Sequence, residues 1–263
     1  MIKKKLVAVC LMLFVVLAWS AQAEDMTLEQ VLEQHANARG GEEAFDAVES
    51  AKVTAKMTMG PGMEAPMTLY VKEPNKMRMD IEIQGAVITQ AWDGEKGWQI
   101  MPLMGVTEAQ EMSEDEAKQI KRQDLIRGLL LTYGEHGYEA EYLGVEEIEG
   151  TPAHKIKVTM EDGDSAVSYL DTEYFMEFMQ EIDGVNPQTG QRVKTKVSYG
   201  DFKEVSGLMM PHSMEMMPEG APSGMSMTIE TIEVNTGDVS DDLFDMPEAS
   251  ADAGSEGDAS GQG

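Results

Sequence analysis

The spacing of apolar residues along the chain changes from a helical period to a strand period. Over residues 28–41, apolar side chains recur every three or four positions behind the capping-box pattern Thr27-Leu28-Glu29-Gln30, and Gly40-Gly41 ends the repeat. A second short helix is predicted over residues 42–50. From residue 51 the period falls to two, which is typical of strands that have one apolar face.

The clearest strand is predicted over residues 76–83, where apolar and charged side chains alternate strictly. Residues 87–92 and 97–101 flank Asp93-Gly94, a typical hairpin turn. A helix is predicted to begin at a second capping box, Ser113-Glu114-Asp115-Glu116, and to run toward Leu131. Other strands are expected over residues 53–59, 67–71, 138–145, 153–160, 166–170, 175–182, 192–202, 208–217 and 225–234. About twelve strands joined by short turns, with two or three helices, indicate an antiparallel meander.

Both ends of the chain differ from this strand-rich middle. Three lysines, an apolar run over residues 6–18 and the small-x-small pattern Ala21-Gln22-Ala23 predict a signal peptide over residues 1–23, cleaved after Ala23, and hence export to the periplasm. Residues 24–247 are predicted to form one domain. Residues 248–263 are rich in Ala, Ser, Gly, Asp and Glu, and we expect an acidic disordered tail there.

Charge and motif content exclude several classes of function. The net charge of −28 argues against a nucleic-acid partner, because phosphate backbones are bound by clustered Lys and Arg. The sequence contains no phosphate-binding loop, nucleophile elbow or H-E-x-x-H motif, and its four histidines stand alone. The single cysteine, Cys10, lies in the predicted signal peptide. We therefore predict a protein without catalytic activity, cofactor or disulfide.

Methionine is unusually frequent, with 23 residues, and many occur in pairs two positions apart on predicted strands. Three interpretations are open. Methionine can replace Leu and Ile in an ordinary core, it can line a surface that adapts to variable apolar guests, or its thioethers can bind Cu(I). Strand alternation argues against copper, because it separates Met209 and Met217 from His212, Met214 and Met216. We favour the adaptable surface and predict no metal site.

Six short motifs along residues 27–247 together resemble the family of LolA-like periplasmic outer-membrane lipoprotein-sorting proteins. Each is a turn or strand-edge signal, and their order and spacing carry the resemblance. The motifs are Ala38-Arg39-Gly40-Gly41 at the end of the first helix, Glu73-Pro74-Asn75-Lys76-Met77-Arg78, Ala91-Trp92-Asp93-Gly94-Glu95-Lys96-Gly97-Trp98, Glu149-Gly150-Thr151-Pro152-Ala153-His154-Lys155-Ile156, Tyr169-Leu170-Asp171 and Leu208-Met209-Met210-Pro211-His212-Ser213.

The resemblance implies a mainly β fold: an incomplete antiparallel β-barrel of about 11–12 strands with helices covering its concave apolar face. It also implies a periplasmic carrier of lipoprotein acyl chains or other lipids, served by an inner-membrane transporter and an outer-membrane acceptor. Two alternatives stay open: an envelope sensor that binds mislocalised lipoproteins, and a Met-rich copper protein. Combined with strand alternation, the resemblance predicts a lipid-binding cavity lined by Met57, Met59, Met67, Leu69, Met77, Met79, Ile81, Ile83, Trp92, Trp98, Met214, Met216, Met225 and Met227.

Overall fold

The computed structural model describes residues 26–60, 62–121, 126–186 and 189–248, and the predicted signal peptide and nearly all of the predicted acidic tail lie outside these ranges. About half of the described residues form one antiparallel sheet of thirteen strands. The strands are β1 (Ser50–Met59), β2 (Met63–Lys72), β3 (Lys76–Ile83), β4 (Ala86–Trp92), β5 (Gly97–Met101), β6 (Val106–Glu111), β7 (Glu139–Ile148), β8 (Thr151–Thr159), β9 (Ser165–Asp171), β10 (Glu177–Val185), β11 (Arg192–Gly200), β14 (Ser213–Pro218) and β15 (Met225–Val234).

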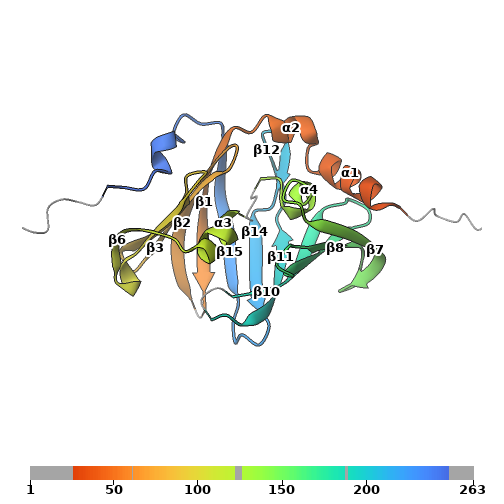
Figure 1. Cartoon of the computed structure of the whole chain (residues 1–263). Helices are drawn as coiled ribbons and strands as arrows, with labels where there is room; N and C mark the ends of the chain where they lie inside the picture. Colours follow the sequence, from red (N-terminus) through yellow and green to blue (C-terminus); the bar gives the residue numbers. More distant parts are fainter. Residues whose placement is uncertain (1–25, 61, 122–125, 187–188, 249–263) are drawn as a thin grey trace, which may run out of the picture.

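The strand order shows how the chain builds this sheet. It runs β6-β5-β4-β3-β2-β1-β15-β14-β11-β10-β9-β8-β7, so one meander leads outward from β1 and a second leads back from β7 to β15. The β1–β15 pair joins the two meanders (Figure 1). β6 and β7 are opposite edges that do not pair with each other, so the predicted incomplete antiparallel barrel is confirmed. β12 (Lys203–Val205) and β13 (Leu208–Met210) form a separate hairpin.

Short helices cover one face of the sheet. They are α1 (Leu28–Ala38), α2 (Glu42–Asp46), α3 (Glu114–Lys121) and α4 (Leu129–Thr132). The described chain also contains two 3-10 turns, η1 (Pro102–Met104) and η2 (Asp241–Leu243). The predicted capping box of α1 is present, because the Thr27 amide donates to Gln30 Oε1 at 2.9 Å and the Gln30 amide donates to Thr27 Oγ1 at 3.3 Å. Figure 1 shows α3 and α4 in front of the central strands. We call this side the helix-covered face.

Two apolar clusters attach the helices to this face. Leu69 of β2 and Met77 of β3 are buried and pack with Ile120 of α3. In the other half of the sheet, Ile156 of β8 packs in one cluster with Val31 of α1 and with α4. The alternation of apolar and polar residues in these strands therefore identifies the buried side, and burial of the apolar side is the main force that orients the sheet.

Two predicted elements are divided in the structure. The helix predicted from residue 113 toward residue 131 is α3 and α4, because Gly128 precedes α4 with φ of +81°, a backbone angle outside the helical region. The strand predicted over residues 208–217 is β13 and β14, separated at Pro211, which has no amide hydrogen for a ladder. The predictions for residues 76–83, 97–101 and 225–234 match β3, β5 and β15.

The opposite face of the sheet carries a C-terminal segment (residues 239–246) across β3, β4 and β5. Phe244 is fully buried, and its carbonyl oxygen accepts a 2.7 Å hydrogen bond from Trp98 Nε1. Arg78 donates to the Leu243 carbonyl at 3.0 Å, and the Lys76 ammonium lies 2.7 Å from Asp241 Oδ1. One buried aromatic ring and several polar bonds therefore hold the end of the domain against the sheet.

Removal of this ring should weaken the domain. We expect Phe244→Ala to lower the free energy of unfolding by about 3–5 kcal/mol, because it leaves a cavity and loosens the partner of Trp98. Urea unfolding followed by tryptophan fluorescence measures both the loss of stability and the expected shift of Trp98 emission to longer wavelength. Met246→Ala, at a position that is 40% exposed, is the matched control and should change stability by less than about 0.5 kcal/mol. Equal stability of the two variants would contradict this role.

Candidate functional site

Six methionines lie side by side across three neighbouring strands, β1, β15 and β14. The strand register pairs Met57 of β1 with Met227 of β15, and Met227 in turn with Met214 of β14. Two residues further along β1, the register pairs Met59 with Met225 of β15, and Met225 with Met216 of β14. Directly opposite residues share a face of the sheet, with Cβ atoms about 4.5–5.5 Å apart. We call these two cross-strand sets the methionine rows: Met57, Met227 and Met214 in the first, and Met59, Met225 and Met216 in the second.

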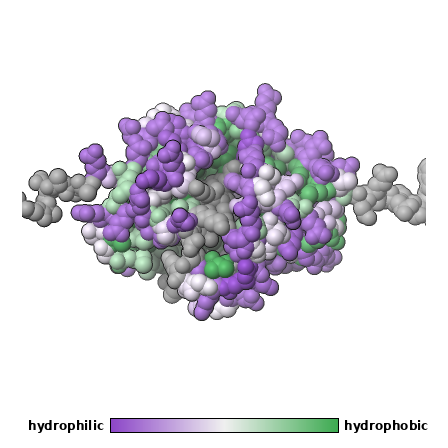
Figure 2. All heavy atoms as spheres, viewed as in Figure 1, coloured by the Kyte–Doolittle hydropathy of each residue, from purple (hydrophilic) through white to green (hydrophobic). Residues whose placement is uncertain are grey.

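The methionine rows lie on the helix-covered face but are not buried by the helices. Met216 and Met225 are each 36% exposed, and the other four methionines are partly exposed. By contrast, Met67 and Met77 are buried beneath the cover. To one side of the rows, Figure 2 shows further apolar side chains over the region of β2, β3 and β6, bordered by hydrophilic ones. The rows therefore form an apolar surface that solvent reaches.

The structure separates the fourteen predicted lining residues into three groups. Met67, Leu69, Met77 and Trp92 are core residues on the helix-covered face, with little exposed surface. Trp98 is a correction: its register with Ala91 places it on the opposite face, where it contacts the C-terminal segment. Trp98 and Trp92 face opposite sides of the sheet because Trp98 pairs with Ala91, the residue next to Trp92 in β4, and neighbouring residues of a strand point to opposite faces. Nine lie on the helix-covered face with partial exposure: Met57, Met59, Met79, Ile81, Ile83, Met214, Met216, Met225 and Met227.

Two cavities lie at the margins of α3, where the cover does not fill the sheet. The first has a volume of about 350 Å³ and is open between the β2–β3 turn and the segment that precedes α4. Its floor is apolar, with Met77, Trp92 and Ile120, and Lys72 and Arg127 lie at its rim. The second, of about 410 Å³, lies beside α3 near Met112. The cover thus leaves space with a mixed polar and apolar lining beside α3, in addition to the open rows.

A group of polar side chains adjoins the methionine rows on β9, β10 and β11. Gln180 Nε2 donates to Ser168 Oγ at 3.2 Å and to Glu177 Oε1 at 3.3 Å. Tyr199 lies directly opposite Met214 in the strand register. We call this group the polar cluster: Ser168, Glu177, Gln180 and Tyr199.

The polar cluster was not predicted from the sequence because it depends on a β-bulge. Glu177 and Gln180 are three residues apart, so a regular strand would place them on opposite faces. The register of β9 and β10 shifts between Glu177 and Met179, and this irregularity brings both side chains to Ser168. Burial raises the pKa of Glu177 to about 7, against the opposing effects of Ser168, Arg39 and Gln180. Burial also raises the pKa of Tyr199.

Arg39 connects the helical cover to the rest of the domain. Its guanidinium donates to the carbonyl oxygens of Arg127 at 2.5 Å and Ile126 at 2.6 Å, in the segment before α4. It also contacts Met210 Sδ at 3.7 Å and lies over the Phe45 ring. Arg39 directly follows α1, so a single side chain links α1, α2, β13 and the α4 segment.

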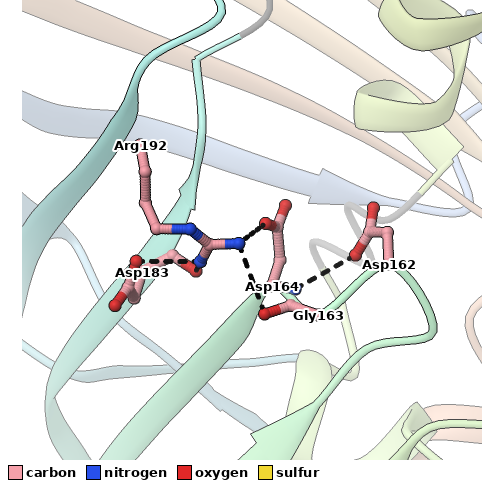
Figure 3. Close-up of polar contacts among 5 residues, drawn as sticks. All are labelled: Asp162, Gly163, Asp164, Asp183 and Arg192. Atoms are coloured by element: carbon pink, nitrogen blue, oxygen red, sulfur yellow. Dashed lines mark hydrogen bonds and ion pairs between the residues drawn. The ribbon is translucent and has the colours of Figure 1, made fainter.

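Other polar groups have structural partners. Arg192 of β11 donates to Asp183 Oδ1 of β10 at 3.0 Å and to Asp164 Oδ1, just before β9, at 3.3 Å (Figure 3). His154 Nδ1 lies 2.8 Å from the Tyr142 hydroxyl, and His212 Nδ1 lies 3.0 Å from the Met210 carbonyl oxygen. Among the described residues, no three His, Cys, Asp or Glu side chains are grouped so as to hold a metal ion. Within the same ranges, every helix is too short or too polar to cross a membrane.

The pKa of Glu177 gives the domain a specific pH dependence. Because the pKa of Glu177 is higher in the folded protein than its ordinary value of 4.5, the protonated carboxyl favours folding. This contribution to stability is fully present below pH 4.5 and is lost as the pH rises through about 7. We therefore expect Glu177→Gln to be more stable than the parent at pH 8 by roughly 1–3 kcal/mol, with a smaller difference at pH 5. Urea unfolding at both pH values measures the effect.

His35 changes the stability of the domain with pH in the opposite direction, and comparison of Glu177→Gln with the parent cancels this change. Burial lowers its pKa to about 4, so its contribution to folding is present above pH 6.5 and is lost as the pH falls toward 4. Because both proteins contain His35, the difference between them isolates Glu177. The same stability difference at pH 5 and pH 8 would refute the assignment of a near-neutral pKa to Glu177.

Comparison with known proteins locates the fold among solved structures. No family model matches the sequence, and no curated protein matches it. A LolA superfamily protein from Nitrosomonas europaea is similar with a TM-score of 0.57 and 15% identity, over 84% of this chain and 98% of that one. A DUF1329 family protein from Desulfovibrio piger has a TM-score of 0.57 and 12% identity, over 83% and 97%. An outer membrane lipoprotein-sorting protein domain from Vibrio parahaemolyticus has a TM-score of 0.54 and 12% identity, over 80% and 93%. The chain therefore has the LolA-like fold that the sequence motifs predict.

Proposed function

We propose that this protein is a non-catalytic periplasmic carrier that holds the acyl chains of lipoproteins or other lipids on its helix-covered face. The observation that carries the proposal is the pair of methionine rows, which place six partly exposed thioether side chains on one side of an open sheet. The LolA-like fold and the lipoprotein-sorting description of one similar structure support it. The predicted signal peptide supports a periplasmic location.

Transfer free energies explain why such a surface suits an acyl cargo. Each methylene group removed from water contributes about 0.8 kcal/mol, so a long acyl chain stays out of water only while it is sheltered. Methionine side chains are unbranched and polarizable, and they can repack around chains that differ in length and position. The methionine rows supply adaptable apolar contact, and the cavities beside α3 supply more enclosed space.

The polar cluster gives the proposed site two chemically different halves. Tyr199 of the polar cluster lies opposite Met214 of the first methionine row. Gln180 is separated from Met216 of the second row by Val197. An acylated molecule has the same division, because its hydrocarbon tails join a polar ester and amide region. In our proposal, the tails lie on the methionine rows and the polar linkage lies near Gln180 and Ser168.

Release of the cargo requires the cover to move or a stronger acceptor to compete. Arg39 holds the carbonyl oxygens of Ile126 and Arg127, so its hydrogen bonds must break for that part of the cover to separate from α1. In our proposal, an inner-membrane transporter loads the carrier and an outer-membrane acceptor unloads it. Transfer then follows the difference in affinity for the acyl chain and needs no reaction by the carrier.

A charge placed on the methionine rows should abolish this binding. We expect Met214→Asp to weaken binding of the uncharged apolar fluorophore N-phenyl-1-naphthylamine at least tenfold, because a carboxylate is costly to cover with an apolar ligand. The matched control is Met217→Asp. Met217 belongs to the same strand, but it pairs with Lys196 on the opposite face and is 48% exposed.

Fluorescence titration of the two variants and the parent measures the affinities, and circular dichroism verifies that each variant is folded. Native mass spectrometry of protein isolated from the periplasm then tests for co-purified acylated molecules, which we expect on the parent and on Met217→Asp only. A parent protein that binds neither fluorophore nor acylated molecules would refute the proposed function, as would equal binding by both variants. Bound copper in place of lipid would favour the metal hypothesis.

A further inference from the structure

We propose that the methionine rows are also an oxidation site, at which conversion of thioethers to sulfoxides switches off the binding of apolar cargo. This inference rests on the proposed function. It names a chemical modification and a regulation of the same surface. The oxidants are peroxides and hypohalous acids.

The geometry of the rows makes their thioethers reachable. Met216 and Met225 lie opposite each other and are each 36% exposed. Met214 and Met227 lie opposite each other in the first row and are partly exposed. Methionine side chains of both rows therefore meet solvent in the folded sheet, where a small oxidant can contact them.

The chain offers no thiol to compete for the oxidant once the predicted signal peptide is removed. Its single cysteine is Cys10. Thioether oxidation thus becomes the main reversible sulfur chemistry of the mature protein. Twenty-three methionines occur in the full chain, and the six in the rows are those whose modification bears on the proposed site.

The reaction is a two-electron oxygen transfer. With hydrogen peroxide, the sulfur lone pair attacks one oxygen atom, the O–O bond breaks, an S–O bond forms, and the second oxygen leaves as water after proton transfer. Sulfur is oxidised and the peroxide is reduced. With hypochlorous acid, the same transfer releases chloride and a proton. Methionine sulfoxide reductases reverse the change.

A sulfoxide in the rows has a strong local effect because its neighbours are apolar. Its oxygen is a strong hydrogen-bond acceptor, whereas the cross-strand neighbours of Met225 are Met59 and Met216, which have no strong donor to offer. Water must supply the missing hydrogen bonds. An acyl chain would then have to displace this water and leave the sulfoxide oxygen unpaired, so binding weakens.

The test compares oxidation and binding in the same samples. The full mature chain is treated with graded hydrogen peroxide, each methionine is quantified by peptide mass spectrometry, and the affinity for N-phenyl-1-naphthylamine is measured by fluorescence titration. We expect the affinity to fall at least tenfold as sulfoxide accumulates in the methionine rows, with an unchanged circular dichroism spectrum. Treatment with methionine sulfoxide reductases A and B should restore the affinity.

Two variants locate the sensitive residues. The first replaces the six row methionines by leucine, and the second replaces Met104, Met217 and Met246, which are exposed and lie outside the rows. Each variant is compared only with itself before and after oxidation. We expect the row variant to lose less than twofold in affinity and the outer variant to lose as much as the parent. If the row variant does not fold, the double variant Met216→Leu with Met225→Leu replaces it and should show a reduced loss.

The outcomes separate this inference from the proposed function. A parent protein that binds no fluorophore before oxidation overturns the proposed function and this inference with it. A parent that binds the fluorophore and keeps its affinity after complete oxidation of the rows overturns this inference alone. Equal sensitivity of the row variant and the parent also overturns it, because the loss then arises at other methionines.

Discussion

The pairing of β1 with β15 is the contact on which the rest of the domain depends. It joins the two meanders, which are otherwise separated by most of the chain, and its register sets Met57 opposite Met227 and so creates the methionine rows. The side chain of Asn235 fixes the start of this pair. Its Nδ2 donates to the Ala47 carbonyl oxygen at 2.7 Å, and its Oδ1 accepts a hydrogen bond from the Glu49 backbone amide at 2.8 Å. A shift of one residue would turn the methionines of β1 away from those of β15.

Local sequence patterns predicted much of the fold, whereas features that depend on long-range pairing of segments could not be predicted from the sequence. The strict alternation of residues 76–83 and the Thr27 capping box were sufficient, because each involves neighbours in sequence. The side of the sheet that Trp98 occupies and the bulge at Glu177 depend on the pairing with other segments. The break before α4 follows from the backbone angle of Gly128, which only the structure shows. Residue type identified the methionine pairs as unusual, whereas only the register showed that pairs from three strands form continuous rows.

An open apolar face and a large negative charge have complementary roles in this molecule. Exposed apolar surface promotes association between copies of a protein, and like charge opposes it. The net charge of −28 therefore lets the domain expose its methionine rows in water. The cations that are present serve largely as internal ties, as when Lys76 pairs with Asp241 and Arg78 with Asp80. The negative charge thus has a role in keeping copies of the protein apart that requires no specific binding partner.

The choice of methionine over leucine on this face involves a physical compromise. A branched side chain fixes one shape well, whereas methionine has three rotatable bonds and conforms to different chains at similar cost. The same residue can become a polar sulfoxide, which leucine cannot. The most deeply buried core positions are aromatic or branched, as at Phe244, Ile156 and Leu170, whereas methionine occurs both in the core, as at Met67 and Met77, and on the open part of the face. Adaptability and sensitivity to oxidants therefore occur together on the helix-covered face, because both arise from the unbranched thioether.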